Sequence, residues 1–263
     1  MGRITETVKH LIIINILLFI APKLLQGFDL QNLFALHFPE NPEFGIWQYV
    51  THMFMHSQQS FMHILFNMYG LWAFGTPLEQ MWGKNKFLFF YFSAGLGAGA
   101  IYTLVNYYQF SSLNNELINL GISTNEISQI VSLQFYDIES FRNACSSILQ
   151  SNTTLIKAID LQTLYDINGM FNTRAVGASG AIYGILVAFG LSFPNSKLAL
   201  IFLPVPIAAK YFIPALIALD LFSGVTGFSL FGGGIAHFAH VGGALIGFII
   251  AWYWKQNQFK RWN

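Results

Sequence analysis

The chain has 263 residues, of which 54% are apolar and only 10% are charged, whereas roughly 25% of the residues in ordinary soluble domains are charged. This composition excludes an ordinary soluble globular protein and indicates a chain that crosses a lipid bilayer several times. A net charge of +1 gives no support for a nucleic-acid partner, and the single cysteine, Cys145, excludes both an intrachain disulfide and a cysteine-cluster metal site.

Six apolar segments are long enough to be membrane helices, since a span needs about 20 mostly apolar residues. In chain order, the predicted helices cover residues 8–25, 61–81, 86–108, 174–193, 209–224 and 235–254. The first resembles a signal peptide, but Ala21-Pro22-Lys23 is a poor cleavage site and the later spans need a correctly oriented first helix. The proline-rich stretch 202–207 is expected to be an interfacial segment, because its prolines cannot hold a regular helix.

Two segments between the helices have their own character. Residues 26–60 are rich in aromatic side chains and interrupted by Pro39 and Pro42, so they are too broken to span the bilayer and too apolar to be fully solvated. We expect an amphipathic first outer loop that lies partly in the outer leaflet. Residues 109–172 are rich in Asn, Ser, Gln and acidic residues. They are expected to form an extramembrane insertion between helices three and four of a single membrane domain, residues 1–263.

The distribution of Lys and Arg predicts the orientation in the membrane. Six spans place both termini on the same side, and nine of the 13 Lys and Arg residues lie on that side, with four on the other. Because these residues are enriched in cytoplasmic loops, both termini are predicted to be cytoplasmic. The sequence carries no targeting extension, which favours the inner (plasma) membrane of a bacterium as the location of this integral membrane protein.

Four polar residues lie in the first turns of helices that run inwards from the outer surface: His63 and Asn67 in helix two, Ser179 in helix four and His240 in helix six. At a rise of 1.5 Å per residue they share a depth of roughly 10 Å, so one site can contain all four. Packing of small residues is the simpler explanation for Ser179 alone. The conjunction of all four favours a functional site, because polar groups are costly within a bilayer.

Helix six also carries small residues that allow close packing. Ala239, Gly243 and Gly247 follow one another at four-residue steps, a pattern that lets a neighbouring backbone approach. His240 is adjacent to this stripe, so the packing that draws helix six inwards also brings the imidazole towards a neighbouring helix.

The four polar residues have the chemistry of a serine hydrolase. A serine hydroxyl becomes a nucleophile when a base accepts its proton, and an imidazole with a pKa of about 6.5 suits that task. Ser179 and His240 are therefore the candidate nucleophile and base, and His63 and Asn67 offer N–H donors for an oxyanion. A channel or transporter is a competing interpretation, but its path must reach both faces, and the inner halves of these helices are almost purely apolar.

Taken in order, the motifs resemble those of the rhomboid family of intramembrane serine proteases. They are His63-x-x-x-Asn67, Gly177-Ala178-Ser179-Gly180 with Tyr183 four residues after the serine, and Ala239-His240-x-x-Gly-x-x-x-Gly. The resemblance implies an all-α, polytopic, rhomboid-like bundle of six transmembrane helices. It also implies a serine endopeptidase that needs no cofactor and no metal, and that cleaves transmembrane protein substrates near the outer face.

The same resemblance implies a role for each site residue. Ser179 and His240 would form a dyad without an aspartate, and Tyr183 would stack on the His240 ring. The backbone N–H of Ser179 would join His63 and Asn67 in the oxyanion hole, with Gly177 and Gly180 as supporting residues. The first outer loop would support the cavity, and helix five with the loop before helix six would form the gate for substrates.

Some features leave alternatives open. Trp47-Gln48 stands where the family has Trp-Arg, which leaves open how the outer loop is held. Asp220 could be a third triad member, but its position near the end of helix five favours a carboxylate exposed to water. A catalytically inactive relative that binds transmembrane clients is the alternative function, although both the serine and the histidine are present.

Three further histidines have competing interpretations. His237, three residues before His240, is a second candidate base, but the glycine spacing favours His240. His52 and His56 could bind a metal, yet without further ligands a hydrogen-bonding role within the outer loop is the simpler expectation.

Overall fold

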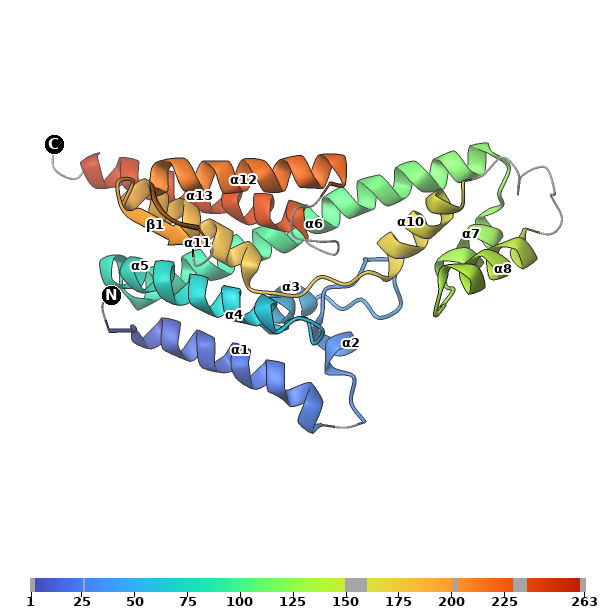
Figure 1. Cartoon of the computed structure of the whole chain (residues 1–263), viewed down its shortest axis with the longest axis horizontal. Coiled ribbons are helices and arrows are strands. Elements are labelled where there is room, and N and C mark those ends of the chain that lie inside the picture. Colours follow the sequence, from blue (N-terminus) through green and yellow to red (C-terminus); the bar gives the residue numbers. More distant parts are fainter. Residues whose placement is uncertain (1–2, 26, 150–159, 201–202, 229–235, 261–263) are drawn as a thin grey trace. The chain divides into compact units, whose positions relative to one another are not determined.

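The structure is a computed structural model that describes residues 3–25, 27–149, 160–200, 203–228 and 236–260. The described residues are mostly helical (Figure 1), and the chain divides into two compact units. Unit 1 comprises Met1–Leu36, Ile46–Tyr102 and Ala175–Asn263, and unit 2 comprises His37–Gly45 and Thr103–Arg174.

Unit 1 contains the helices that correspond to the predicted spans. Its elements are α1 (Glu6–Leu24), α2 (Leu30–Phe34), α3 (Gln48–Thr51), the 3₁₀ turn η1 (His52–Phe54), α4 (Phe61–Gly70), the π-helical turn η2 (Leu71–Gly75), α5 (Thr76–Trp82), the first part of α6 (Lys84–Asn119), α11 (Ser179–Ser192), β1 (Lys197–Leu200), β2 (Leu203–Ala208), α12 (Ala209–Thr226) and α13 (His237–Lys260).

Among the described residues, four helices are long and apolar enough to cross a membrane, namely α1, α6, α12 and α13 over His237–Asn257. Residues 61–82 form an uninterrupted helical run through α4, η2 and α5, and the π-helical turn lies just before Pro77, which cannot donate a helical hydrogen bond. Of the predicted all-α membrane bundle, the coarse part is confirmed: the described residues are mostly helical and include helices long enough to span a membrane.

Three helix boundaries differ clearly from those predicted. Helix α6 continues to Asn119 rather than ending near residue 108, α11 begins at Ser179 rather than at residue 174, and α13 continues to Lys260 rather than ending near residue 254. The second difference has a clear cause, because Leu36 and Ala175 exchange two backbone hydrogen bonds of 2.9 and 2.8 Å. The chain before Ser179 is therefore extended and paired with the outer loop instead of helical.

The proline-rich stretch before α12 belongs to a β-hairpin, so the all-α prediction is wrong there. Strands β1 and β2 pair antiparallel, with Lys197 opposite Ala208. Both strands of a two-stranded sheet are edges, where proline is tolerated because one side of the backbone needs no partner strand. The prolines thus exclude a helix, as predicted, without excluding a strand.

Helix α11 packs at backbone contact distance against α13 and against alanine side chains of α6. A Cβ atom built on Gly243 would lie 1.9 Å from the carbonyl oxygen of Gly180, and one built on Gly247 would lie 2.5 Å from the Cα of Gly184. Towards α6, a Cβ on Gly180 would lie 2.5 Å from the Ala98 Cβ. The close approach predicted from the small-residue stripe of helix six is confirmed.

The core of unit 1 surrounds α11. Most residues of this helix are buried, which explains why it is apolar on all sides. Side chains from the other elements complete the core, among them Val8, Met53, Leu71, Phe87, Tyr91, Ile213 and Ala244.

Unit 2 has a hydrophobic core of its own. Helices α7 (Thr124–Val131), α8 (Ile138–Ile148) and α10 (Leu161–Asn172) supply most of its buried side chains, including Ile130, Phe141 and Ile167. The unit is larger than the predicted insertion, because residues 37–45 join it through Phe38. Cys145 lies in this core, and burial raises the pKa of its thiol to about 11, so the thiol stays protonated near neutral pH.

Glu79 caps the N-terminus of α1, and its removal is expected to destabilise the protein. Its buried carboxylate accepts the backbone N–H groups of Thr7 at 3.1 Å and Val8 at 3.0 Å, which have no acceptor within the helix. Glu79→Ala leaves both donors unpaired and should lower the free energy of unfolding by about 1–3 kcal/mol, seen as a lower melting temperature in detergent. Glu6→Ala removes an exposed carboxylate from the same helix turn and should change it little. Equal melting temperatures for Glu79→Ala and the unmodified protein would rule out this cap.

Candidate active site

Ser179 and His240 lie at the N-terminal ends of two helices that pack together. Ser179 is the first residue of α11, and His240 lies one turn after the start of α13. The Oγ of Ser179 is 2.8 Å from the Nε2 of His240. At this distance the hydroxyl can donate a hydrogen bond to an unprotonated Nε2, which is the geometry that proton transfer from serine to histidine requires.

The turn before Ser179 requires glycine. Gly177 has a φ of +126°, a conformation that residues with side chains rarely adopt. Its backbone N–H donates to the carbonyl of His52 at 2.9 Å. A Cβ at Gly177 would lie 2.9 Å from the Nε2 of His63, so the absence of a side chain also leaves space beside the serine.

Tyr183 stacks on the imidazole of His240, as the family resemblance implies. The two rings lie 4.2 Å apart with an angle of 13° between their planes. Tyr183 follows Ser179 by one helical turn, so both side chains point from the same face of α11. The stack holds the plane of the imidazole next to the serine hydroxyl.

Asp220 is buried, and the prediction of a water-exposed carboxylate is wrong. It is 6% exposed, and its Oδ1 lies 3.2 Å from the Nδ1 of His240 and 2.5 Å from the Nδ1 of His237. Its Oδ2 accepts a hydrogen bond from the hydroxyl of Tyr183. One sequence signal could have indicated this role: Asp220 is the only acidic residue after Asp166, and an acidic group within an apolar span indicates function.

His63 directs an N–H group towards the space beside Ser179. Its Nδ1 accepts the backbone N–H of Ser57 at 3.3 Å, so the proton of the neutral ring is on Nε2. This Nε2 faces the position that a Gly177 Cβ would occupy, and that position is 3.5 Å from the Ser179 Oγ.

Asn67 lies one turn after His63 and is also buried. Its amide donates to the carbonyl of His63 at 2.7 Å, along its own helix, and its Oδ1 accepts no hydrogen bond from the described residues. The structure therefore places Asn67 beside His63 without a hydrogen bond to Ser179.

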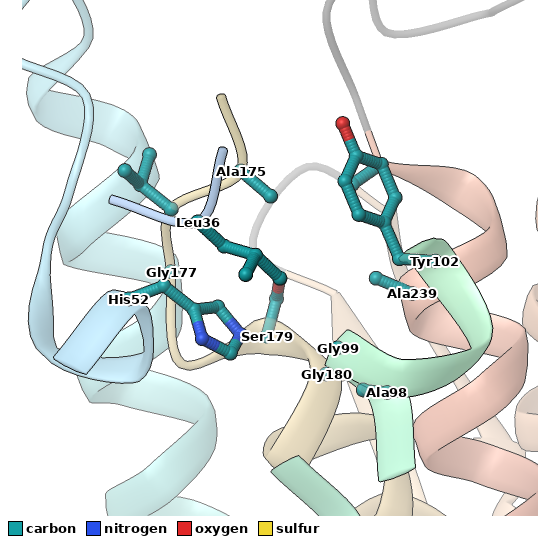
Figure 2. Close-up of a pocket in the computed structure, with 12 residues that line it drawn as sticks. Leu36, His52, Ala98, Gly99, Tyr102, Ala175, Gly177, Ser179, Gly180 and Ala239 are labelled. Atoms are coloured by element: carbon teal, nitrogen blue, oxygen red, sulfur yellow. The ribbon is translucent and has the colours of Figure 1, made fainter. Parts of the chain in front are cut away.

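A small pocket opens at the serine. Figure 2 shows the Ser179 hydroxyl between His52 on one side and Tyr102 and Ala239 on the other. Leu36 and Ala175, the two residues of the backbone bridge, line it, and the space between the lining side chains has room for about one water molecule.

The outer loop has Gln48 where the family resemblance implies an arginine, and hydrogen bonds between uncharged groups hold it in place. The indole N–H of Trp47 and the amide of Gln48 both donate to the carbonyl of Leu33, at 2.9 and 3.4 Å. The hydroxyl of Thr51 donates to the carbonyl of Phe34 at 2.8 Å. The loop is thus attached to α2 without an ion pair from Gln48.

His52 and His56 are buried parts of this loop. The Nδ1 of His52 donates to the carbonyl of Gln48 at 2.7 Å, as expected for a hydrogen-bonding role. Burial lowers the pKa of His52 to about 4 and that of His56 to about 3, so both rings are neutral near pH 7.

The predicted gate loop before α13 falls on residues 229–235, which lie outside the described residues.

Comparison with known proteins identifies the family. A model of the Rhomboid domain matches residues 43–128 and 153–257. The mitochondrial Rhomboid protein 1 of Saccharomyces cerevisiae is 26% identical over 197 residues, which cover 75% of this chain and 39% of that protein. The human mitochondrial presenilin-associated rhomboid-like protein is 25% identical over 249 residues, or 94% of this chain and 47% of that protein.

A bacterial relative has a similar degree of identity. Rhomboid protease AarA of Providencia stuartii is 26% identical over 218 residues, which cover 78% of this chain and 54% of that protein. The chain thus spans about half of the length of these relatives, or less. The Rhomboid domain match covers most of the chain, and on that match the chain belongs to the rhomboid family.

Proposed function

We propose that this protein is an intramembrane serine endopeptidase that cleaves transmembrane segments of other membrane proteins near the outer face of the membrane. The observation that carries the proposal is the 2.8 Å contact between the Ser179 Oγ and the His240 Nε2. Membership in a family that includes a named protease, AarA, supports it further.

The reaction follows from this contact. As the Ser179 Oγ bonds to the carbonyl carbon of the scissile peptide, its proton passes to the His240 Nε2. When the peptide C–N bond breaks, that proton passes to the leaving amine. A water molecule then attacks the acyl-enzyme and gives a proton to His240. Release of the new carboxylate and return of the proton to the Ser179 Oγ complete the cycle, without a cofactor or a metal.

The oxyanion would be held by the backbone N–H of Ser179 together with His63 and Asn67. The first N–H groups of a helix lack acceptors within it, and Ser179 opens α11. The Nε2–H of His63 faces the same space. Asn67 would contribute an amide N–H when a substrate is bound.

Substitutions in this group are expected to slow turnover more than they weaken substrate binding. His63→Ala and Asn67→Ala should each lower kcat by roughly 10- to 1000-fold with little change in KM, because the donors act on charge that develops during the reaction. The measurement is steady-state cleavage of a single-span substrate by purified variants.

Asn15→Ala provides a matched control for Asn67→Ala. Asn15 is also buried and also donates to the carbonyl four residues earlier at 2.7 Å, but it lies in α1. If the two asparagines affected melting temperature and kcat equally, Asn67 would be a structural residue only.

The membrane arrangement is part of the proposal. We propose a six-helix bundle in which the run 61–82 and the short helix α11 cross the membrane together with α1, α6, α12 and α13, and in which the outer loop lies partly in the outer leaflet. The Lys and Arg distribution supports cytoplasmic termini. The inner membrane of a bacterium is the proposed location, and the matched relatives include one bacterial and several mitochondrial proteins.

Substrate spans that unwind easily are expected to be cleaved fastest. A peptide bond in a helix is shielded by helical hydrogen bonds, and Gly or Pro destabilises a helix by about 1 or 3 kcal/mol. The small pocket beside Ser179 favours a small residue before the scissile bond. A test substrate with a Gly-Ala segment near the outer end of its span should be cut, and bulky substitutions there should block cleavage. Efficient cleavage of a rigid poly-leucine span would contradict this expectation.

The experiment that tests the activity uses the purified full chain in detergent. It should cleave at least one of a panel of single-span proteins, and a fluorophosphonate should label it at Ser179. Chelators should have no effect. Absence of both cleavage and labelling would contradict the protease function and favour the alternative, a catalytically inactive relative.

A further inference from the structure

Asp220 connects the candidate base to two neighbouring side chains. Its carboxylate lies in α12, and its side chain is 8% exposed. One oxygen is 3.2 Å from the His240 Nδ1 and 2.5 Å from the His237 Nδ1, and the other accepts the hydroxyl of Tyr183. Every partner is a potential donor, which suits an ionised carboxylate because it can only accept.

This arrangement determines which nitrogen of His240 carries the proton. For His240 to accept the proton of Ser179, its Nε2 must be unprotonated, so the proton of the neutral ring must lie on Nδ1. The Asp220 carboxylate accepts a hydrogen bond from the Nδ1–H of His240 and therefore favours that tautomer. The Tyr183 stack fixes the plane of the ring, and the Asp220 contact fixes its rotation within the plane.

The charge of Asp220 also suits the reaction. When His240 takes the serine proton it becomes a cation, and its side chain is only 12% exposed. A charge so poorly hydrated needs a partner of opposite sign, and the Asp220 carboxylate is already in contact with the ring.

We propose that Asp220 is a positioning residue for His240. In this protein the Ser179–His240 dyad would therefore act together with a third linked group, the Asp220 carboxylate. The inference rests on the proposed protease function. It adds to that function a residue that touches neither substrate nor reacting atoms and acts through the base.

Two other roles would use the same contacts. A purely structural Asp220 would tie α12 to α13 through both histidines. A metal could also bind, because ligand atoms of Asp220, His237 and His240 lie within 4.8 Å of one another. The structure favours the positioning role, because the carboxylate already satisfies both Nδ1 atoms and leaves Nε2 of His240 on the serine.

The test compares Asp220→Asn with His237→Asn in the purified full chain. Asn at residue 220 keeps the size of the side chain but removes its charge and can present an N–H to His240. We expect a fall in kcat of about 10²- to 10⁴-fold with less than about a threefold change in KM, and a parallel fall in the rate of fluorophosphonate labelling at Ser179. His237→Asn removes a contact to the same carboxylate and an edge-on ring contact to His240, but it leaves the Asp220–His240 and His240–Ser179 contacts in place, and it should cost less than about tenfold.

Asp220→Glu keeps a carboxylate and should recover part of the rate lost in Asp220→Asn. Labelling is measured per folded molecule, so a partly unfolded variant still reports the reactivity of its serine. Equal kcat and labelling rates in Asp220→Asn and the unmodified protein would overturn the proposal while leaving the protease function intact. Equal losses of rate and of melting temperature in Asp220→Asn and His237→Asn would overturn it in favour of a structural tie.

Two controls separate this inference from the function on which it rests. If the unmodified protein neither cleaves nor labels, the protease function and the role of Asp220 fail together. If a chelator such as EDTA lowers the turnover of the unmodified protein, the three residues hold a metal and the positioning role is overturned.

Discussion

Ser179→Ala and His240→Ala are each expected to reduce cleavage to background. The Ser179 Oγ forms the bond to the substrate and His240 accepts its proton across 2.8 Å, so neither residue can act without the other. In serine proteases the loss of either member costs roughly 10⁶-fold in kcat, and the double substitution costs little more than either single one. The measurement is cleavage of a single-span substrate by the purified single and double variants.

Matched controls come from the same chain. Ser192 ends the helix that Ser179 begins, and His10 is exposed on α1, so Ser192→Ala and His10→Ala should each change turnover by less than about twofold. All variants should keep a melting temperature close to that of the unmodified protein. Turnover near normal in either Ser179→Ala or His240→Ala would show that the dyad is not the catalytic unit.

The sequence predicts the site residues that interrupt apolar helices. Ser179, His240, His63 and Asn67 could be identified because a polar side chain in a span is costly, and because the helical rise puts all four at one depth. The small-residue stripe of helix six predicted a close approach to a neighbouring helix, since a backbone contact requires residues without large side chains, and the structure identifies that helix as α11. These inferences depend on local spacing and on the bilayer, both of which can be read from one chain.

The contacts of Asp220 could not be predicted in the same way. Its position near the end of α12 suits water as well as burial, and the choice depends on how α12 packs against α13. The predicted start of α11, at residue 174, was wrong for a related reason. The backbone bridge between Leu36 and Ala175, which keeps the preceding segment extended, joins segments far apart in the sequence. Helix periodicity contains no information about such long-range pairs.

The second large effect is expected from Gly243→Ala, far from any reacting atom. A Cβ at residue 243 would lie 1.9 Å from the Gly180 carbonyl oxygen, and this neighbour is backbone that cannot rotate away. Helices α11 and α13 must therefore separate, at a cost of about 1–3 kcal/mol or more. Because Gly180 is next to Ser179 and Gly243 is one turn after His240, the separation also lengthens the contact between nucleophile and base. A displacement of about 1 Å can lower turnover by roughly 100-fold, so melting temperature and kcat should fall together.

Gly169→Ala makes the same chemical change where there is space. Gly169 lies inside α10, and a Cβ there meets no atom within 4 Å, so the substitution should leave turnover unchanged and stabilise its helix by up to about 1 kcal/mol. The two variants thus differ in the sign of the stability change, which separates a clash from a general effect of alanine. Gly243→Ala with normal melting temperature and normal kcat would mean that α11 and α13 can move apart without disturbing Ser179 and His240. The close backbone contact would then not be what positions the dyad.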